Sequence, residues 1–125
     1  RRGLIYNNMK DKNKIKDLLK ARRTHRTRVN IFGTAKCPRL AVYKSLKHIS
    51  IQAIDDEKGV TLASASDRGA KGKTRKDKAK EVGTLISKKL IEKKVTKCVF
   101  DKRHYRYHGL IKELADSARD GGLKF

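Results

Sequence analysis

The sequence has no tryptophan, a single proline, one methionine and only two cysteines among its 125 residues. Cys37 and Cys98 lie far apart and form no CxxC pair, so we expect two reduced thiols in an intracellular protein. No apolar run approaches the ~20 residues needed to span a bilayer, and no apolar segment follows the basic first residues. We therefore expect neither a membrane span nor a secretory signal. The only methionine is Met9, and the sequence leaves open both a processed extension before it and a start at Met9.

Acidic residues are also scarce. The chain has 13 Asp and Glu against 34 Lys and Arg, a net charge of +21. Because such a charge repels itself in a compact monomer, the partner should be a polyanion. The candidates are nucleic acid, an anionic membrane surface or a very acidic protein. The excess is uneven, with a strongly basic stretch in residues 1–39, a neutral stretch in 40–66 and a second basic stretch in 67–80. We therefore predict a basic, partly helical N-terminal arm (1–38) and a globular domain (39–125) that contains a basic loop and binds the polyanion.

Hydrophobic periodicity predicts four strands and two helices in residues 39–125. Three short strands, 39–44, 48–54 and 60–65, are separated by polar turns, and Ile49, Ile51 and Ala53 alternate onto one face of the second. A helix beginning at Arg75 carries Ala79, Val82, Ile86 and Leu90 on one stripe, flanked by Leu85. Residues 96–100 form a short strand. The last helix begins at His108 or Gly109, carries Ile111, Leu114, Ala115 and Ala118 on one face, and ends at Gly121-Gly122.

The order of these elements restricts the topology. Short connections make the first three strands an antiparallel meander, so strands one and three point the same way. A strand–helix–strand crossover is normally parallel and right-handed, which places the fourth strand beside the first. We predict an α+β fold: a mixed four-stranded sheet of order 3-2-1-4 covered by two helices, resembling the ribonuclease H-like motif.

The arm contains little that could be buried. Its apolar stripe consists of Ile15, Leu18 and Leu19, and the arginine-rich residues 22–28 follow. A helix that is charged nearly all round gains little from packing. We expect the arm to be frayed or disordered in the free protein and ordered on RNA.

Catalysis, metal binding and membrane binding are poorly supported. The four histidines and two cysteines do not have the spacing of a ligand set. Nuclease chemistry on a ribonuclease H-like sheet needs clustered carboxylates for two metal ions, whereas the chain offers only Asp101 after the fourth strand. The apolar stripe of the arm is too small for an amphipathic membrane helix. We therefore predict no enzyme, metal, cofactor, small-molecule substrate or membrane partner.

RNA binding has support from four basic segments. They are the arginines Arg22, Arg23, Arg26 and Arg28; the corner Lys44, Ser45, Lys47 and His48; the loop Arg68, Lys71, Lys73, Arg75 and Lys76; and the segment Arg103, Tyr105, Arg106, Tyr107 and His108. Arginine forks suit phosphate, and aromatic rings between cations can stack on bases. The alternatives are a solvated charged face for the arm, a mobile loop for residues 66–74, and a tyrosine, Tyr107, that fills the core beneath the last helix.

Several motifs resemble a known family. Pro38-Arg39-Leu40, Ser45-Leu46-Lys47-His48-Ile49, Thr61-Leu62-Ala63-Ser64-Ala65-Ser66, Val99-Phe100-Asp101, Tyr107-His108-Gly109 and the C-terminal residues 114–125 are similar to the bacterial-type large-subunit ribosomal protein L-eighteen. The similarity runs from about residue 20 to the C-terminus. It implies a structural protein of the central protuberance that binds 5S rRNA, joins it to 23S rRNA and contacts neighbouring large-subunit proteins. The expected location is the cytoplasmic ribosome, with a bacterium favoured over an organelle.

The resemblance also implies contact residues. They would fall on residues 22–28, which include Thr24 and His25, on Arg39, Lys44, Lys47 and His48, and on residues 105–108. The chain departs from the family in two places. Lys102-Arg103-His104 stands where the family usually has Arg-Gly-Gly or similar, and Leu110 stands where it usually has Arg; Arg103 or Arg106 is a candidate substitute for that missing contact. A general basic RNA chaperone or regulatory protein is the alternative function, and selectivity for a folded RNA separates the two.

Overall fold

The computed structural model of the protein describes residues 8–125, with side chains from residue 12 onward. It contains, in chain order, α2 (Asn8–Arg28), β1 (Arg39–Lys44), β2 (Ile49–Asp55), β3 (Val60–Ser66), α3 (Arg75–Glu92), β4 (Val99–Asp101) and α4 (Leu110–Asp120). The strands form one sheet of order β3-β2-β1-β4, in which β1 is antiparallel to β2 and parallel to β4. The predicted α+β fold and strand order are confirmed.

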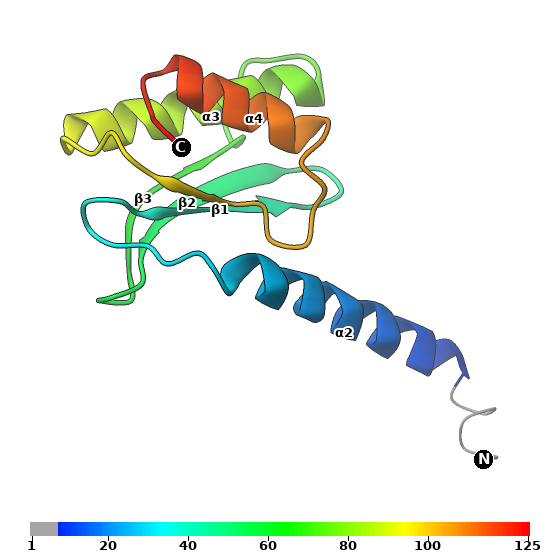
Figure 1. Ribbon diagram of the computed structural model, residues 1–125. Helices are drawn as coiled ribbons and strands as arrows, with labels where there is room; N and C mark the ends of the chain where they lie inside the picture. Colours follow the sequence, from blue (N-terminus) through cyan, green and yellow to red (C-terminus); the bar gives the residue numbers. More distant parts are fainter. Residues whose placement is uncertain (1–7) are drawn as a thin grey trace.

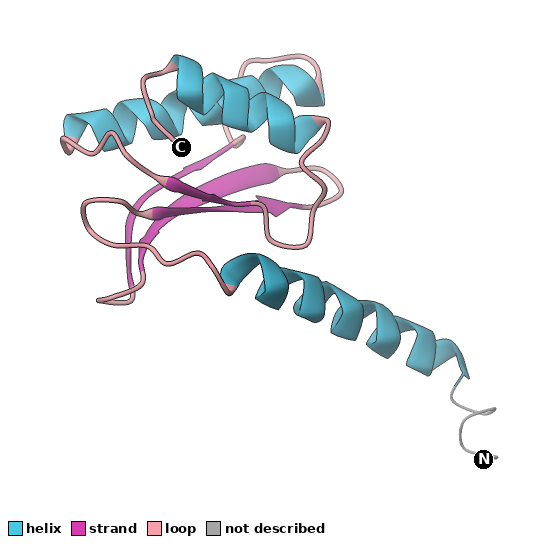
Figure 2. Cartoon of the chain, viewed as in Figure 1, coloured by secondary structure: helices cyan, strands magenta, loops and turns pink. Residues whose placement is uncertain are grey.

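The sheet has two different faces. Helices α3 and α4 lie together over one face, whereas α2 lies on the other side and extends away from the domain (Figures 1 and 2). Ile49, Ile51 and Ala53 alternate along β2 and are buried in the core, as predicted. The predicted apolar stripes of α3 and α4 are buried in the same core. Because successive strand residues point to opposite faces, the residues between them on β2 belong to the side away from α3 and α4.

Close contact between α3 and α4 depends on a glycine. A Cβ atom built at Gly83 would lie 2.5 Å from the carbonyl oxygen of Leu114 and 2.7 Å from Cβ of Ser117. Any side chain at this position would push the two helices apart. The backbones of α3 and α4 are therefore in direct contact at this point of the helix pair that covers the sheet.

The predicted fourth strand is too long at its start. Residues 96–98 pair with the C-terminal segment instead of with β1, because the Cys98 N–H donates to the Lys124 carbonyl at 2.9 Å and the Lys124 N–H donates to the Thr96 carbonyl at 2.8 Å. The strand beside β1 is only Val99–Asp101. The C-terminus thus closes the domain, and the Phe125 ring stacks on Phe100 with centroids 5.4 Å apart.

The arm differs from the expectation of a frayed segment. Residues 8–28 form one continuous helix, and Ile15, Leu18 and Leu19 are exposed on it. Its last turns gain partners that the sequence does not reveal, since they contact the loop that follows β4. Tertiary contacts at the C-terminal end of α2 provide part of the stabilisation that its weak apolar stripe cannot provide.

A buried ion network joins the base of the sheet to the segment that follows α2. Arg39 donates from Nη1 to Oδ2 of Asp101 at 2.8 Å and from Nε to Oδ2 of Asp56 at 2.9 Å. Its side chain is 7% exposed and that of Asp101 is fully buried. Asp56 also accepts from the Gly33 N–H at 2.8 Å and lies 3.9 Å from the Arg28 guanidinium. Asp56 therefore ties β1, the β2–β3 turn and the end of α2 together.

The network predicts a pH dependence of stability. The pKa of the Asp56 carboxyl is lowered, chiefly because Arg39 donates hydrogen bonds to it and also because the Gly33 N–H does so. A lowered folded-state pKa stabilises the fold above the unfolded pKa, and this contribution is lost as the pH falls through the folded value. We expect the free energy of unfolding to drop below about pH 4 and expect Asp56→Asn to flatten that drop. Urea denaturation over a pH series measures both, and identical profiles would contradict the assignment.

Candidate nucleic-acid interface

The arm is attached to the domain through the loop that follows β4. Thr27 Oγ1 donates to the carbonyl oxygen of Arg103 at 2.9 Å, and Thr24 Oγ1 lies 3.4 Å from Nδ1 of His104. Thr24 Oγ1 donates to the Lys20 carbonyl at 2.9 Å, and the single Thr27 hydroxyl proton is shared between the Arg103 carbonyl and the Arg23 carbonyl, which lies 3.0 Å from Oγ1. One face of the helix therefore docks on residues 103–104, and the arginines on its other faces stay exposed.

The same loop is fastened to the end of β1. The Tyr105 hydroxyl donates to the Lys44 carbonyl and accepts from the Lys44 N–H, both at 2.9 Å. Tyr105 also packs against the hydrophobic core, whereas Tyr107 is 38% exposed and touches Phe100 only edge-on. The expectation that Tyr107 fills the core is therefore wrong. Tyr105 is the tyrosine that packs against the core, where it is half-buried, and both hydrogen bonds of its hydroxyl go to Lys44 at the strand end.

The turn between β1 and β2 joins the basic loop to this surface. Arg75 donates from Nη2 to the Ser45 carbonyl at 2.8 Å. Ser45 Oγ accepts from the His48 N–H at 3.1 Å, which closes the turn. The His48 ring in turn contacts the buried carboxylate of Asp67, with Nδ1 and Oδ1 3.1 Å apart. Asp67 was not singled out from the sequence, because nothing in its local pattern indicates a partner 19 residues away.

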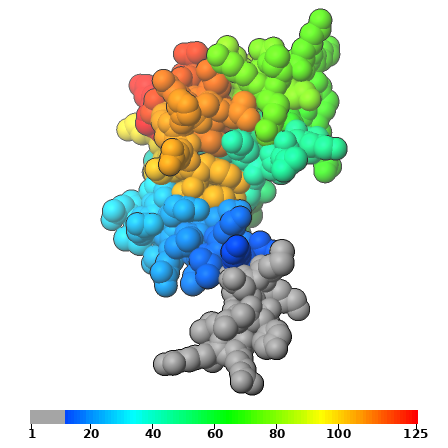
Figure 3. Space-filling model, turned by 90° about the vertical axis from the view of Figure 1, so that its right-hand side faces the viewer, coloured from blue at the N-terminus to red at the C-terminus, as the bar shows by residue number. Residues whose placement is uncertain are grey.

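Direct contacts thus connect all four basic segments into one basic band. We define the basic band as Arg22–Arg28 of α2, residues 102–108, residues 44–48, and the loop from Arg68 to Arg75; Lys76, the last cation of the predicted loop, lies outside it and pairs with Glu113 at 3.4 Å. Figure 3 shows the four segments on one side of the molecule, from the blue helix through the orange loop to the turquoise and green segments. Within residues 12–125, the only cationic side chains of the band that lie within 4 Å of a carboxylate are Arg28 and, where it is protonated, His48. The other described cations of the band have no carboxylate within 4 Å, and all of them except the half-buried Arg103 are exposed.

A groove runs along the contact between α2 and the loop. It is lined by Arg23, Arg26, Thr27, Lys102, Arg103, His104, Tyr105 and Arg106. No carboxylate lines it, so its potential is strongly positive. The pKa of the His104 imidazole is lowered, first by burial and then by Arg103, Lys20 and Arg23. His104 is therefore a neutral hydrogen-bonding group beneath the arm, while the arginines supply the charge.

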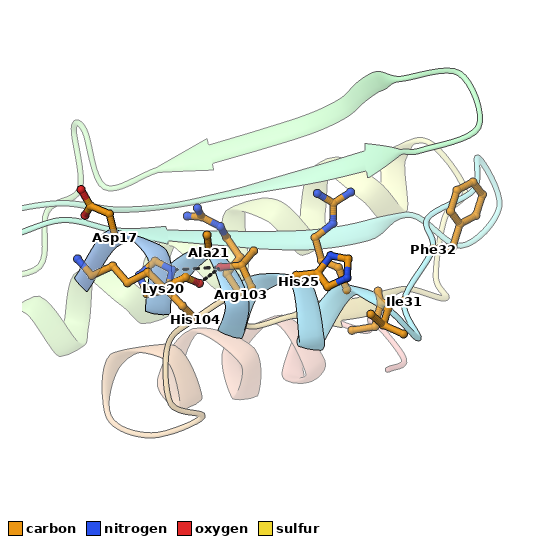
Figure 4. Close-up of a pocket in the computed structure, with 11 residues that line it drawn as sticks. Asp17, Lys20, Ala21, His25, Ile31, Phe32, Arg103 and His104 are labelled. Atoms are coloured by element: carbon orange, nitrogen blue, oxygen red, sulfur yellow. Dashed lines mark hydrogen bonds between the residues drawn. The ribbon is translucent and has the colours of Figure 1, made fainter. Parts of the chain in front are cut away.

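A second hollow lies on the other side of the same helix. Figure 4 shows its lining, with Lys20 and His25 on α2, Phe32 after it, and Arg103 and His104 from the loop. Phe32 is 59% exposed and Val29 is 64% exposed. This hollow combines apolar and cationic walls with one carboxylate, that of Asp17, and Arg103 and His104 belong to both recesses.

The structure separates the predicted contact residues that are exposed from those that are buried. The side chains of Arg22, Arg23, His25, Arg26, Lys44, Lys47, Arg106 and His108 are exposed, as are those of Lys71, Lys73 and Arg75. Thr24 is half-buried against His104, and Arg39 is almost fully buried in its ion network. Arg39 therefore supports the fold and presents no surface for a ligand. Tyr43 is the residue that sequence reasoning missed, because only the fold brings it to Arg103.

Other kinds of site find little support in the described part of the chain. No group of three or more His, Cys, Asp or Glu within it is placed to hold a metal ion. None of the described helices combines the length and the apolar character of a membrane span. The basic band is accordingly the surface on which a function can be argued.

Comparison of the sequence with known proteins identifies a family and close relatives. Residues 14–125 match the family described as ribosomal L18 of archaea, bacteria, mitochondria and chloroplasts. The large ribosomal subunit protein uL18 of Limosilactobacillus reuteri is 53% identical over 117 residues, which cover 92% of this chain and 96% of that protein. The uL18 of Petrotoga mobilis is 51% identical, with 88% and 95% covered, and that of Brachyspira hyodysenteriae is 47% identical, with 89% and 98% covered.

Proposed function

The chain belongs to the ribosomal L18 family, and from this premise we propose that it binds 5S rRNA and helps to attach it to 23S rRNA in the central protuberance. It is a structural, non-enzymatic protein of the large ribosomal subunit, and it works in translation as part of the cytoplasmic ribosome. Its partners are ribosomal RNA and other ribosomal proteins. The two specific RNAs are the part that we propose.

The observation that carries the proposal is the continuity of the basic band. Hydrogen bonds from Thr27 to Arg103, from Tyr105 to Lys44 and from Arg75 to Ser45 link the four segments within the free protein. A surface whose cations are held at fixed separations favours an RNA whose phosphates have matching positions. A flexible polycation of equal charge would bind any RNA. Fixed contacts therefore support recognition of a folded RNA by its shape.

Two RNA contacts are expected to act in different ways. The N-terminal turns of α2, which carry the exposed Lys12, Lys14 and Lys16, extend away from the domain (Figure 1) and can follow a phosphate backbone at a distance from the sheet. The loop 102–108 and the turn at residues 44–48 lie on the domain itself and can contact a second part of the RNA. A protein with a helical arm on one side and a compact domain on the other is suited to joining two RNA elements, which supports the proposed attachment of 5S rRNA to 23S rRNA.

The proposal is tested by the preference for a folded RNA. We expect the protein to bind native 5S rRNA at least about tenfold more tightly than a linear RNA of equal length and charge, at about 0.15 M salt. Filter binding or fluorescence anisotropy measures both dissociation constants. Equal affinities would favour a general RNA chaperone and would contradict the proposed function.

A further inference from the structure

Arg103 has an unusual backbone conformation. Its φ is 57°, in the left-handed region that L-residues other than Gly, Asn and Asp seldom adopt. The conformation is held from both sides, because the Arg103 N–H donates to Oδ1 of Asp101 at 2.8 Å and its carbonyl accepts from Thr27. Asp101 is fully buried and is itself fixed by Arg39. Strained residues that the surrounding structure over-determines are concentrated at functional sites, so the role of the side chain is the next question.

The strained backbone places the Arg103 guanidinium on an aromatic ring. Its Cζ lies 4.3 Å from the centroid of Tyr43, the distance of a cation–π contact. Tyr43 is 37% exposed, and it alternates along β1 with Leu40 and Val42, which are buried in the core with α3 and α4. The ring therefore lies on the sheet face turned away from those helices. Its neighbours across the sheet are Ser50 and then Ser66.

The charge around the pair favours an anionic ligand. No carboxylate among the described residues lies within 4 Å of the Arg103 guanidinium; the recorded ion pairs use other cations. Arg103 lines the groove with Arg23, Arg26 and Arg106. A guanidinium stacked on a ring keeps a second planar face and its N–H edge for a ligand. The groove thus offers cations for a phosphate next to a flat stacking surface.

The exposed stacking surface and the neighbouring cations together favour an unpaired nucleotide over a paired one. Aromatic rings and arginine planes stack on bases that have left a helix, because the faces of paired bases are covered by their neighbours. We propose that Arg103 and Tyr43 form a stacking site for an unpaired nucleotide of the bound RNA, whose phosphate is held by Arg23, Arg26 and Arg106. The inference deepens the proposed function and rests on the protein being an RNA binder. It assigns to Tyr43 a role in the interface.

The test uses a substitution that keeps the positive charge and removes the planar guanidinium. Arg103→Lys in the full chain retains the cation, whereas a lysine cannot stack as a guanidinium does. We expect it to weaken binding to a ten-nucleotide single-stranded RNA by about tenfold, with little change for a blunt RNA duplex of the same charge. The salt dependence of binding should stay unchanged, because the number of cations is the same.

Arg119→Lys is the matched control. The Arg119 guanidinium also lies on a ring, 4.7 Å from the centroid of Phe125, but in α4 on the opposite side of the sheet. We expect it to bind both RNAs as the parent does. If Arg103→Lys behaves like Arg119→Lys on the single strand, or weakens single strand and duplex equally, the stacking site is wrong. A failure of the proposed function would appear separately, as a lack of preference for 5S rRNA in the parent protein.

A second variant separates binding from folding. Arg103→Gly relieves the positive φ and removes the stacked side chain. We expect its thermal unfolding midpoint to stay within a few degrees of the parent, or to rise, while its affinity for the single strand falls at least as much as that of Arg103→Lys. A large drop in the midpoint, with single-strand affinity unchanged in the folded protein, would show that Arg103 serves the fold and would overturn the inference.

Discussion

Replacing Asp101 by Ala is expected to lower the free energy of unfolding by about 3 kcal/mol. Asp101 is fully buried, and its two oxygens accept from Arg39 Nη1 and from the Arg103 N–H, both at 2.8 Å. Removing it leaves a buried guanidinium with one carboxylate partner in place of two and leaves a backbone donor without an acceptor. Both losses act where β1, β4 and the loop that follows β4 meet.

Chemical denaturation followed by circular dichroism measures this loss. Asp120→Ala is the control, because Asp120 is exposed at the end of α4 and its loss should change stability by less than about 0.5 kcal/mol. The midpoint of Asp101→Ala should shift strongly at an unchanged slope. Equal midpoints for the two variants would mean that the Arg39 network contributes little and that Asp56 alone satisfies Arg39.

The largest expected effect on binding comes from removing three arginines of the groove. We expect the variant with Arg23, Arg26 and Arg106 all changed to Ala to bind 5S rRNA roughly 100-fold more weakly at about 0.15 M salt. The three side chains line one groove, and none is within ion-pair distance of a described carboxylate. Each lost phosphate contact should also reduce the slope of log affinity against log salt by about 0.7 to 0.9.

The control for this variant removes the same charge elsewhere. Lys88, Lys112 and Arg119 are exposed on α3 and α4, over the opposite face of the sheet. Changing all three to Ala should lower affinity only a few-fold, through the loss of long-range attraction. If both triple variants lose the same affinity and the same slope, net charge alone explains binding and the groove has no special role.

Much of the fold is predictable because its cause is local. The alternation of Ile49, Ile51 and Ala53 predicts a strand with one buried face, and the stripe from Ala79 to Leu90 predicts the covering helix. The handedness of the crossover then leaves one position for β4. The start of β4 is not predictable from the local pattern, because residues 96–98 pair with the distant C-terminal segment around Lys124.

The site was less predictable than the fold. The excess of cations identifies the segments that could bind RNA, but it does not say which cations are free. Arg39 and Arg103 have the same chemistry in the sequence, yet one lies buried between two carboxylates and the other lies on Tyr43. Tyr105 and Tyr107 are likewise equivalent until the fold gives one of them Lys44 as a partner. These differences arise from tertiary contacts, so only the structure separates the roles.

The central claim is that the basic band recognises 5S rRNA by shape and not by charge alone. Competition titration tests it most directly, with labelled 5S rRNA, unlabelled transfer RNA and salt raised from about 0.05 to 0.3 M. We predict that both affinities fall with salt, since phosphate contacts are common to both, but that 5S rRNA stays at least about tenfold preferred at 0.2 M salt. Two curves that coincide at every salt concentration would contradict the account and would leave a basic protein with no preferred RNA.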